Sequence, residues 1–300
     1  MDKPFLLHLF TPMPQASPFD VNMAYDAGYH AVIPYTSISL ADVPNLTQDA
    51  IFSRGPKGVQ RTGIFIGGRE IGLAADMLDA ARKAMFPPFQ VSVFADPSGA
   101  FTTAAALVAA VEQKLKRVHN VTLAGRDVVV LGGTGPVGAA AAVLASGAGA
   151  RVRIASHSSA SRAQMTSQVV NARYNTSTQH ADASSQDHVS QLLNEADVVL
   201  ACAKAGVQVL SKAQLAAAPR LLVAADINAV PPAGIEGIGM TDDGVELATA
   251  SGKTVGIGAL AVGNIKYQVM RTLFEAMLQS EKPLYLDFRD AFESARRLAA

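Results

Sequence analysis

Hydrophobic residues recur along the chain in short runs, and most stretches between the runs have helical periodicity. In the first third, the runs predict strands at residues 5–10, 30–35, 62–67 and 90–95. A helix is expected to begin near Ser17, where Pro18 suits the first helical position. Further helices are expected at residues 40–53, 69–85 and about 101–118. This alternation predicts an α/β fold.

The second half repeats the alternation more sharply, with apolar runs at residues 127–131, 151–155, 197–202 and 221–225. These runs are continuous, which is typical of parallel strands covered on both faces. A helix is expected at 259–279. Because a polar stretch at 117–120 separates the halves, we expect a smaller N-terminal α/β domain over 1–119 and a parallel-sheet domain over 120–258.

Composition narrows the classes of function. Lys and Arg number 25, and so do Asp and Glu, so the chain lacks the basic face of a nucleic-acid-binding protein. Hydrophobic residues reach 49%, but aromatic residues only 6%, so we expect a core packed with Ala, Val, Leu and Ile.

Several kinds of site and location are also disfavoured. The single cysteine, Cys202, excludes an internal disulfide and is interpreted as a small core residue. The six histidines lack metal-ligand spacing, so no metal is expected. The N-terminus does not resemble a signal peptide, and no apolar run approaches the ~20 residues that cross a bilayer. We therefore expect a cytoplasmic protein with no membrane partner.

The strongest local signal is a glycine-rich loop between the apolar run 127–131 and an Ala-rich helix. Gly133, Gly135 and Gly138 fit the GxGxxG pattern of dinucleotide-binding domains. In that pattern the first glycine allows a tight turn, the second lets a pyrophosphate approach, and the third permits close packing of helix and strand. The candidate cofactor-binding residues here are Gly133, Thr134, Gly135, Pro136, Val137 and Gly138. No Lys–Ser/Thr follows, which excludes a P-loop.

The end of the next strand indicates which dinucleotide binds. No carboxylate occurs there to accept a bond from a ribose hydroxyl, and four side chains could donate to a 2′-phosphate: Ser156, His157, Ser158 and Arg162. The sequence therefore favours NADP, with NAD tolerated, over FAD. A solvated loop with a helix N-cap is the alternative for each of these residues.

Loops that leave the carboxyl ends of parallel strands are where ligands bind. We expect Ala203 and Lys204 near the cofactor ribose, Asn228 in the loop after the following strand, and Gly258 where a nicotinamide ring needs close access to backbone.

In the N-terminal domain, polar residues open two helices and are candidates for substrate binding: Asp20, Asn22, Asp96, Ser98, Thr102 and Thr103. Helix capping is the alternative for them, most of all for Asp96 and Ser98. Lys266, on the otherwise apolar stretch AVGNIKYQVM, is a further candidate, with snorkelling to the surface as its alternative.

The chain resembles the NAD(P)-dependent methylene-tetrahydromethanopterin dehydrogenases of bacterial one-carbon metabolism. The resemblance covers nearly the whole sequence, and the matching stretches are residues 17–21, 94–103, the glycine loop, 225–235 and 256–266. It implies hydride transfer from methylene-tetrahydromethanopterin to NAD(P)⁺, with the pterin in a cleft between an N-terminal domain and a Rossmann domain. It also implies that two long helices, 101–118 and 259–279, join the domains, that residues 259–300 pack back on the first domain, and that the chain forms homo-oligomers.

The resemblance implies roles for two residues. The family's pterin-contacting aspartate maps to Asp20, and its cleft lysine maps to Lys266. Strictly NADP-dependent relatives carry Arg–Lys where this chain has His157–Ser158, which fits a dual-specificity enzyme better. Because the reaction removes a hydride and no proton, it needs no general base, metal or flavin. We expect Asp20 to favour the positive charge that develops on the pterin and Lys266 to orient it.

Two other functions remain open. Methylene-tetrahydrofolate dehydrogenases carry out the same hydride transfer on another carrier, but the cyclohydrolase activity of bifunctional folate enzymes is not expected, because no YxxxK pattern follows Tyr25 or Tyr29. A non-catalytic NAD(P)-sensing protein would keep the Rossmann domain but would not need Asp20, Thr102 or Lys266.

Overall fold

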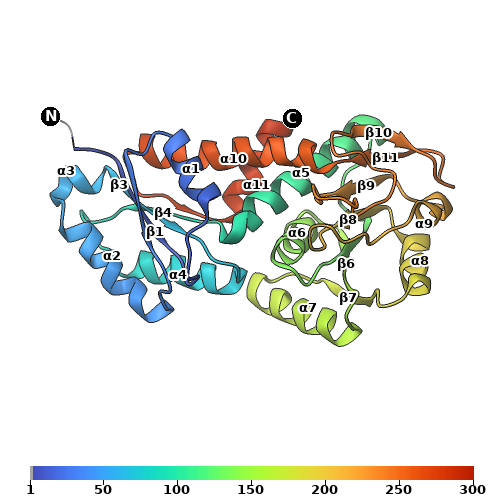
Figure 1. The fold of residues 1–300 in the computed structure, drawn as a ribbon, viewed down its shortest axis with the longest axis horizontal. Helices are drawn as coiled ribbons and strands as arrows, with labels where there is room; N and C mark the ends of the chain where they lie inside the picture. The colour runs from blue at the N-terminus through green and yellow to red at the C-terminus, as the bar shows by residue number, and fades with distance from the viewer. Residues whose placement is uncertain (1–2) are drawn as a thin grey trace. The chain divides into compact units, whose positions relative to one another are not determined.

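The structure, a computed structural model, describes residues 3–300 except the side chain of Pro56, and it confirms the α/β class (Figure 1). The first elements are β1 (Leu6–Phe10), α1 (Pro18–Asp26), β2 (Ala31–Tyr35), η1 (Leu40–Asp42), α2 (Val43–Phe52), α3 (Gly55–Val59), β3 (Thr62–Ile66), α4 (Ile71–Lys83), β4 (Ser92–Ala95), η2 (Pro97–Gly99) and α5 (Ala100–His119). They are followed by β5 (Asp127–Leu131), α6 (Pro136–Gly147), β6 (Arg151–Ser156), α7 (Ala160–Tyr174), β7 (Gln179–Asp182), α8 (Gln186–Glu195), β8 (Val198–Ala201), α9 (Lys212–Ala217) and β9 (Val223–Asp226). The last elements are β10 (Asp243–Leu247), β11 (Thr254–Ile257), α10 (Ala259–Gln279), β12 (Tyr285–Leu286) and α11 (Phe288–Ala299).

The chain divides into two compact units. One contains the chain up to Thr102 together with Tyr267–Ser294, and the other contains Thr103–Lys266 together with Ala295–Ala300. Two of the three divisions fall inside the long helices α5 and α10, and the third falls inside α11. Helix α5 ends at His119, next to the domain boundary expected from the sequence, whereas the compact units separate between Thr102 and Thr103.

The first unit is built on a five-stranded sheet of order β12-β4-β3-β1-β2. All its pairs are parallel. The edge strand β12 comes from near the end of the chain, and its Tyr285 and Leu286 pair with Val93 and Phe94 of β4. The sheet is therefore completed by residues about 190 positions away in sequence.

Aromatic side chains form the centre of this unit. The rings of Phe65 and Phe94 lie 5.3 Å apart, and Phe274 of α10 lies 5.4 Å from Phe65 and 5.3 Å from Phe94. All three side chains are fully buried, and each contributes about 1.5–3 kcal/mol of burial free energy. The expected core of Ala, Val, Leu and Ile is therefore incomplete for this unit, because the few aromatic residues of the chain are concentrated in it.

The second unit is built on a seven-stranded sheet of order β10-β11-β9-β8-β5-β6-β7. All pairs are parallel except β10 with β11. Chain order reverses at β5, which has β6 on one side and β8 on the other. This reversal is the topological switch point at which open α/β sheets bind ligands.

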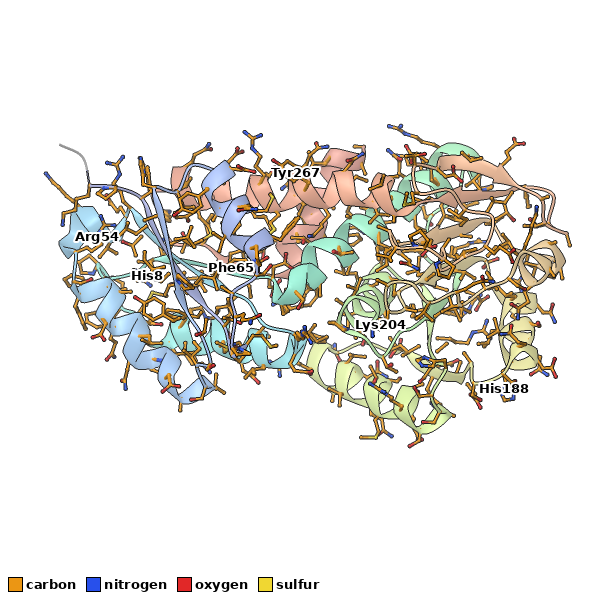
Figure 2. The ribbon with its side chains drawn as sticks, in the orientation of Figure 1. His8, Arg54, Phe65, His188, Lys204 and Tyr267 are labelled. Atoms are coloured by element: carbon orange, nitrogen blue, oxygen red, sulfur yellow. The ribbon has the colours of Figure 1, made fainter. Side chains whose placement is uncertain are left out.

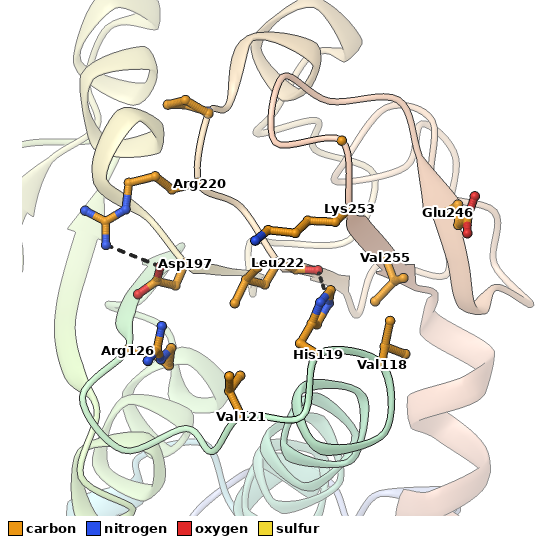
Figure 3. A pocket seen from close by; sticks show the side chains of 12 residues that line it. Val118, His119, Val121, Arg126, Asp197, Arg220, Leu222, Glu246, Lys253 and Val255 are labelled. Atoms are coloured by element: carbon orange, nitrogen blue, oxygen red, sulfur yellow. Dashed lines mark hydrogen bonds and ion pairs between the residues drawn. The ribbon is translucent and has the colours of Figure 1, made fainter.

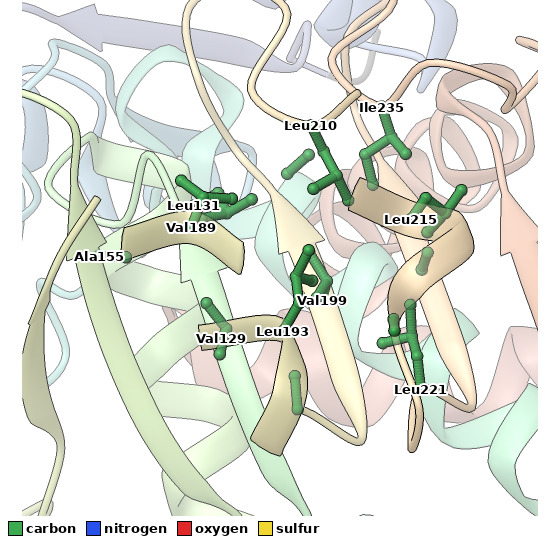
Figure 4. Close-up of a cluster of buried hydrophobic side chains, with 14 of the residues drawn as sticks. Val129, Leu131, Ala155, Val189, Leu193, Val199, Leu210, Leu215, Leu221 and Ile235 are labelled. Atoms are coloured by element: carbon green, nitrogen blue, oxygen red, sulfur yellow. The ribbon is translucent and has the colours of Figure 1, made fainter. Parts of the chain in front are cut away.

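A cluster of small aliphatic side chains packs one face of this sheet, as the composition predicts (Figure 4). Val129, Leu131 and Val199 of the strands meet Val189 and Leu193 of α8 and Leu215 of α9. This layer fixes the strand ends from which the candidate site is built.

The helix expected at 40–53 begins differently in the structure. Leu40–Asp42 is a 3-10 turn, and the α-helix begins at Val43. Asp42 accepts hydrogen bonds from both the backbone nitrogen and the hydroxyl of Ser39, each at 2.7 Å. This capping box, followed by Pro44, separates the 3-10 turn from the helix proper.

Candidate active site

The turn between β5 and α6 is made by Gly132, whose φ is +74°. A Cβ atom on Gly132 would lie 2.6 Å from the backbone nitrogen of Ala203, so only glycine fits there. The sequence pattern assigned the tight turn to Gly133, and this assignment was wrong by one residue. Gly133 is needed for packing instead, because its Cβ would lie 2.9 Å from Ile154 of β6.

The other two glycines of the loop differ in what surrounds them. A Cβ on Gly138 would lie 2.7 Å from both the Gly132 carbonyl oxygen and the Gly133 Cα, so the loop itself requires glycine there. A Cβ on Gly135 would have its nearest neighbour at 3.5 Å, an ordinary contact. Within the described chain, therefore, nothing in the packing demands a glycine at position 135.

Helix α6 begins directly at this loop. Gly135 is its N-cap and has no side chain with which to cap the first turn, and Pro136 has no N–H group. The backbone N–H groups of Val137 and Gly138 therefore stand at the positive end of the helix, which is the usual arrangement for binding an anion. The loop and the helix end together have the geometry that is typical of phosphate-binding loops.

The predicted cofactor residues at the end of β6 have different environments. The hydroxyl of Ser156 is buried and accepts a bond from the Ser158 nitrogen at 3.2 Å. His157 and Ser158 are exposed and lie within 3.4 Å of one another through Nε2 and Oγ. Arg162, also exposed, lies in the first turn of α7, whose N-cap is Ser159. The strand end thus carries an arginine, a histidine and hydroxyls, and no carboxylate.

A cavity of about 370 Å³ opens beside the glycine loop. Gly132 and His157 line it together with two segments that follow β7 and β8, and the lining residues from those segments are Ala183, Ser184, Ser185, Gln186, Val189, Val207, Gln208 and Val209. Sequence reasoning missed these residues. Strand β7 has the polar sequence QHAD, so hydrophobicity did not reveal the strand or the loop after it.

Asn228 joins the loops that follow β8 and β9. Its Oδ1 accepts bonds from the nitrogens of Gly206 and Val230, both at 3.0 Å, and its Nδ2 donates to the Pro232 oxygen at 2.8 Å. Both ends of the amide are thus occupied inside the protein. The structure supports a role for Asn228 in holding the loops and does not require that it touch a cofactor.

Asp226, at the end of β9, organises the same loop. Its carboxylate accepts bonds from the nitrogens of Asn228 and Ile235, both at 2.9 Å. Burial raises the pKa of this carboxyl, and the backbone N–H bonds oppose that shift. The pKa of the neighbouring Cys202 thiol is also raised by burial and then by the Asp226 charge, which leaves the thiol protonated. Its burial agrees with its interpretation as a core residue.

Two other predicted cofactor residues lie in the same unit. A Cβ on Gly258 would lie 2.0 Å from the Gly239 carbonyl oxygen, so glycine is required there by the adjoining backbone. Lys204 is exposed in the loop after β8 (Figure 2). Its neighbour Ala203 is half-buried against Gly132.

Asp96 and Thr102 cap helix α5. The Asp96 carboxylate accepts bonds from the backbone nitrogens of Phe101 (2.8 Å) and Thr102 (3.2 Å) and from the Thr102 hydroxyl (2.6 Å). Ser98 has a φ of 55°, and its hydroxyl donates to the Gly68 oxygen at 2.7 Å. The capping alternative therefore accounts for Asp96 and Thr102, and a loop contact accounts for Ser98. Thr103, the next residue, is half-buried.

Asp20 is buried near the carboxyl ends of β1 and β3. It lies in the first turn of α1, where Ser17 is the N-cap and accepts a bond from the Asp20 nitrogen. A Cβ on Gly67 would lie 3.7 Å from Asp20 Oδ2 and 3.7 Å from Thr11 Cβ, so these groups surround one point. Asn22 is exposed on the same helix. Lys266 is half-buried in the second turn of α10, in the other unit.

In the described part of the chain, no group of three or more His, Cys, Asp or Glu side chains is placed to hold a metal ion. None of the helices formed by residues 3–300 has the length and hydrophobicity needed to cross a membrane.

Comparison with known proteins shows the family to which the chain belongs. Residues 18–98 match the model of the methylene-tetrahydromethanopterin dehydrogenase N-terminal domain, and residues 102–232 match that of the alanine dehydrogenase/PNT C-terminal domain. The NAD(P)-dependent methylenetetrahydromethanopterin dehydrogenase of Methylorubrum extorquens is 47% identical over 98% of both chains. The chain belongs to this dehydrogenase family. The resemblance noted from the sequence is thereby confirmed. A second protein of that organism, named bifunctional protein MdtA, is 31% identical over 98% of this chain and 99% of its own.

Solved structures show the same fold at low identity. Quinate dehydrogenase from Corynebacterium glutamicum, in complex with NAD, has a TM-score of 0.51 at 14% identity over 97% of this chain and 98% of its own. The NAD-dependent malic enzyme of Thermotoga maritima has a TM-score of 0.56 at 12% identity, over 97% of this chain and 84% of its own. These likenesses support the fold class.

Proposed function

We propose that this protein oxidises methylene-tetrahydromethanopterin to the methenyl form and transfers the hydride to NAD(P)⁺. The observation that supports this most strongly is its 47% identity, over 98% of both chains, with the Methylorubrum extorquens enzyme of that name. The reaction moves one hydride from the methylene carbon and leaves a methenyl cation. Charge therefore balances without any proton transfer.

The glycine loop supports the dinucleotide part of the proposal. Because the packing leaves room for a Cβ at position 135, the glycine there is best explained by close approach of a ligand's phosphate groups. Backbone N–H groups of Val137 and Gly138 would hold these groups at the start of α6. The cavity beside Gly132 and His157 would take the adenosine portion. When bound, the oxidised dinucleotide supplies the hydride acceptor, nicotinamide C4.

The end of β6 supports NADP as the preferred dinucleotide, with NAD also accepted. His157, Ser158 and Arg162 are all exposed there and can donate hydrogen bonds to a 2′-phosphate. His157 also lines the cavity next to the glycine loop. No carboxylate follows β6 to repel the phosphate.

We further propose that Asp20 and Lys266 contact the pterin. The Asp20 carboxylate, only 4% exposed, would stabilise the positive charge that develops on the pterin as the hydride leaves. Lys266 would donate hydrogen bonds to an oxygen of the pterin and so orient it. Correct alignment of the two reactants is itself worth several kcal/mol of the barrier, about 7–11 kcal/mol at best.

The test is an assay of the purified full-length chain with methylene-tetrahydromethanopterin and methylene-tetrahydrofolate, each with NADP⁺ and NAD⁺. Formation of the reduced dinucleotide is followed by its absorbance. We expect rapid reduction with the methanopterin carrier. A higher kcat/KM with the folate carrier would replace this proposal by the folate alternative, and no reduction with either carrier would leave a dinucleotide-sensing protein. Light scattering of the same sample will measure the homo-oligomer that the family resemblance implies.

A further inference from the structure

A second cavity, of about 670 Å³, lies in the Thr103–Lys266 unit (Figure 3). Four of its lining residues each directly precede a strand of the seven-stranded sheet, namely Arg126 before β5, Asp197 before β8, Leu222 before β9 and Lys253 before β11. These four strands run parallel. The cavity is therefore at the amino ends of these strands, whereas the glycine loop lies at the carboxyl end of β5.

Cationic side chains exceed anionic ones in this cavity. Its charged lining residues are Arg126, Arg220, Lys253, Asp197 and Glu246, with His119 as a further titratable group. Asp197 is already engaged, because its Oδ2 accepts a bond from the Asp127 nitrogen at 2.9 Å and its Oδ1 one from Arg220 at 3.3 Å. Glu246 is exposed, and its carboxylate lies away from the Lys253 ammonium (Figure 3).

Arg126 and Lys253 remain without an anionic partner. Among residues 3–300, neither side chain forms an ion pair or hydrogen bond, and the Arg126 Nε atom is buried without an acceptor. A buried donor left unpaired costs roughly 1–3 kcal/mol, so this arrangement is unfavourable for the folded chain alone. Lys253 extends across the cavity toward Leu222 (Figure 3).

His119 is a third side chain of this cavity that can interact with an anion. Its Nε2 lies 3.1 Å from the Leu222 carbonyl oxygen, which can only accept, so Nε2 carries the proton. The other ring nitrogen, Nδ1, becomes a donor only when the ring is charged. Burial lowers the pKa of His119, the bond to Leu222 raises it, and the positive charge of Lys253 lowers it further. An anion between His119 and Lys253 would reverse the effect of Lys253.

The remaining wall is apolar and consists of Val118, Val121, Leu222, Val255 and Pro219. A volume of this size is typical of small-molecule sites, about 300–1,000 Å³. We propose that this cavity binds a small phosphate monoester with an apolar body, held by Arg126, Lys253 and His119 and separate from the dinucleotide site. The three donors come from different segments, which suits the tetrahedral oxygens of phosphate better than a planar carboxylate.

The test uses the whole protein with its histidine imidazoles labelled for NMR. Inorganic phosphate or phenyl phosphate is titrated at constant ionic strength, with chloride as the reference. The His119 signal is assigned by its loss in His119→Gln. We expect saturable movement of this signal, an upward shift of its titration midpoint, and about tenfold tighter binding of phenyl phosphate, because its ring buries apolar surface against the valines.

Two variants and a matched control decide the outcome. Lys253→Gln and Arg126→Gln should each weaken phosphate binding about tenfold, whereas Lys212→Gln, at an exposed lysine of the same unit, should leave it unchanged. The proposed site would be overturned if phosphate moved the His119 signal no more than chloride does. It would also be overturned if Lys253→Gln, Arg126→Gln and Lys212→Gln all bound phosphate with equal affinity. Affinity for phenyl phosphate no higher than for phosphate would overturn the apolar part. The NMR signal comes from His119, at the amino ends of the strands, and the glycine loop lies at a carboxyl end. These results therefore do not depend on whether the proposed dinucleotide function is correct.

Discussion

The Thr102 hydroxyl donates a hydrogen bond of 2.6 Å to Oδ2 of Asp96, and both side chains are fully buried. The same carboxylate accepts the first backbone N–H groups of α5 through Oδ1. A buried carboxylate is tolerated only when such bonds replace its hydration. This pair therefore fixes where α5, one of the two long helices, begins.

Replacing Thr102 by valine should destabilise the protein without changing its shape. The Thr102→Val side chain is isosteric but leaves Asp96 Oδ2 without its hydroxyl donor, so the free energy of unfolding should fall by about 1–3 kcal/mol. Urea denaturation measures this change. Thr241→Val, at an exposed threonine, is the control and should have little effect. Equal stability of the two variants would contradict the capping role.

Gly135→Ala should separate cofactor binding from folding. Because a Cβ at position 135 meets nothing closer than 3.5 Å, the variant should fold normally but bind NADP⁺ at least about tenfold more weakly. Gly138→Ala should instead lower thermal stability, since its Cβ would lie 2.7 Å from two backbone atoms. Gly147→Ala, on the same helix with open space around it, is the control. Calorimetric titration with NADP⁺ would disprove the assignment if Gly135→Ala bound as tightly as Gly147→Ala.

His157→Asp should shift the choice of dinucleotide. A carboxylate at the end of β6 would repel a 2′-phosphate and accept a bond from the ribose of NAD, so the ratio of kcat/KM for NADP⁺ over NAD⁺ should fall about tenfold or more. Gln164→Glu adds the same charge at an exposed position of α7 and should leave the ratio nearly unchanged. A ratio that is equal in both variants would place the 2′-phosphate elsewhere.

Asp20→Asn should slow turnover while leaving dinucleotide binding intact. The amide keeps the shape of the buried side chain but removes the charge proposed to favour the methenyl cation, so kcat should fall by about tenfold or more. Asp49→Asn, exposed in the same unit, serves as the reference. If the affinity for NADP⁺ falls in parallel with kcat, Asp20 is needed for folding and the proposed role is wrong.

His8 should make stability depend on pH. Burial, followed by the positive charge of Arg54, lowers the pKa of His8 below its ordinary value of 6.5 (Figure 2). The unfolded chain therefore takes up this proton at a higher pH than the folded chain, and the free energy of unfolding falls as pH decreases from 6.5 toward the folded pKa. His8→Gln should lose less stability over this range. His180→Gln, at an exposed histidine, should behave like the parent protein, and an identical pH profile for His8→Gln would refute the argument.

Continuous apolar runs made much of the fold predictable from the sequence. The strands around the glycine loop are buried on both faces, so hydrophobicity alone marks them, as in Val128–Leu131. Two edge strands, β7 and β12, gave no such signal, although the edge strand β2 was predicted from its apolar run at 30–35. β7 is polar and β12 contains only two residues, so β7 depends on pairing with the preceding strand β6 and β12 on pairing with the distant β4.

The parts of the candidate site that depend on a local sequence pattern were predictable. The parts that depend on contacts between residues far apart in the sequence were less so. The glycine spacing predicted the position of the loop, but the role of Gly132 follows from its contact with Ala203, which is 71 residues later in the sequence. Likewise, the sequence offered helix capping as an alternative for both Asp20 and Asp96, more strongly for Asp96, but could not show which carboxylate is used in that way. The structure separates the two by their surroundings. The Asp96 carboxylate accepts hydrogen bonds from the start of α5, whereas the Asp20 carboxylate lies near the carboxyl ends of β1 and β3.

The pairing of β12 with β4 constrains the order in which the chain can assemble as it leaves the ribosome. All strands of the seven-stranded sheet have been synthesised once Ile257 is added, whereas the five-stranded sheet is complete only after Tyr285 and Leu286 are added. The N-terminal residues, although made first, thus complete their sheet last. A protein shortened by its final few dozen residues would retain all seven strands of the later sheet and leave β4 as an unprotected edge, open to pairing with other chains.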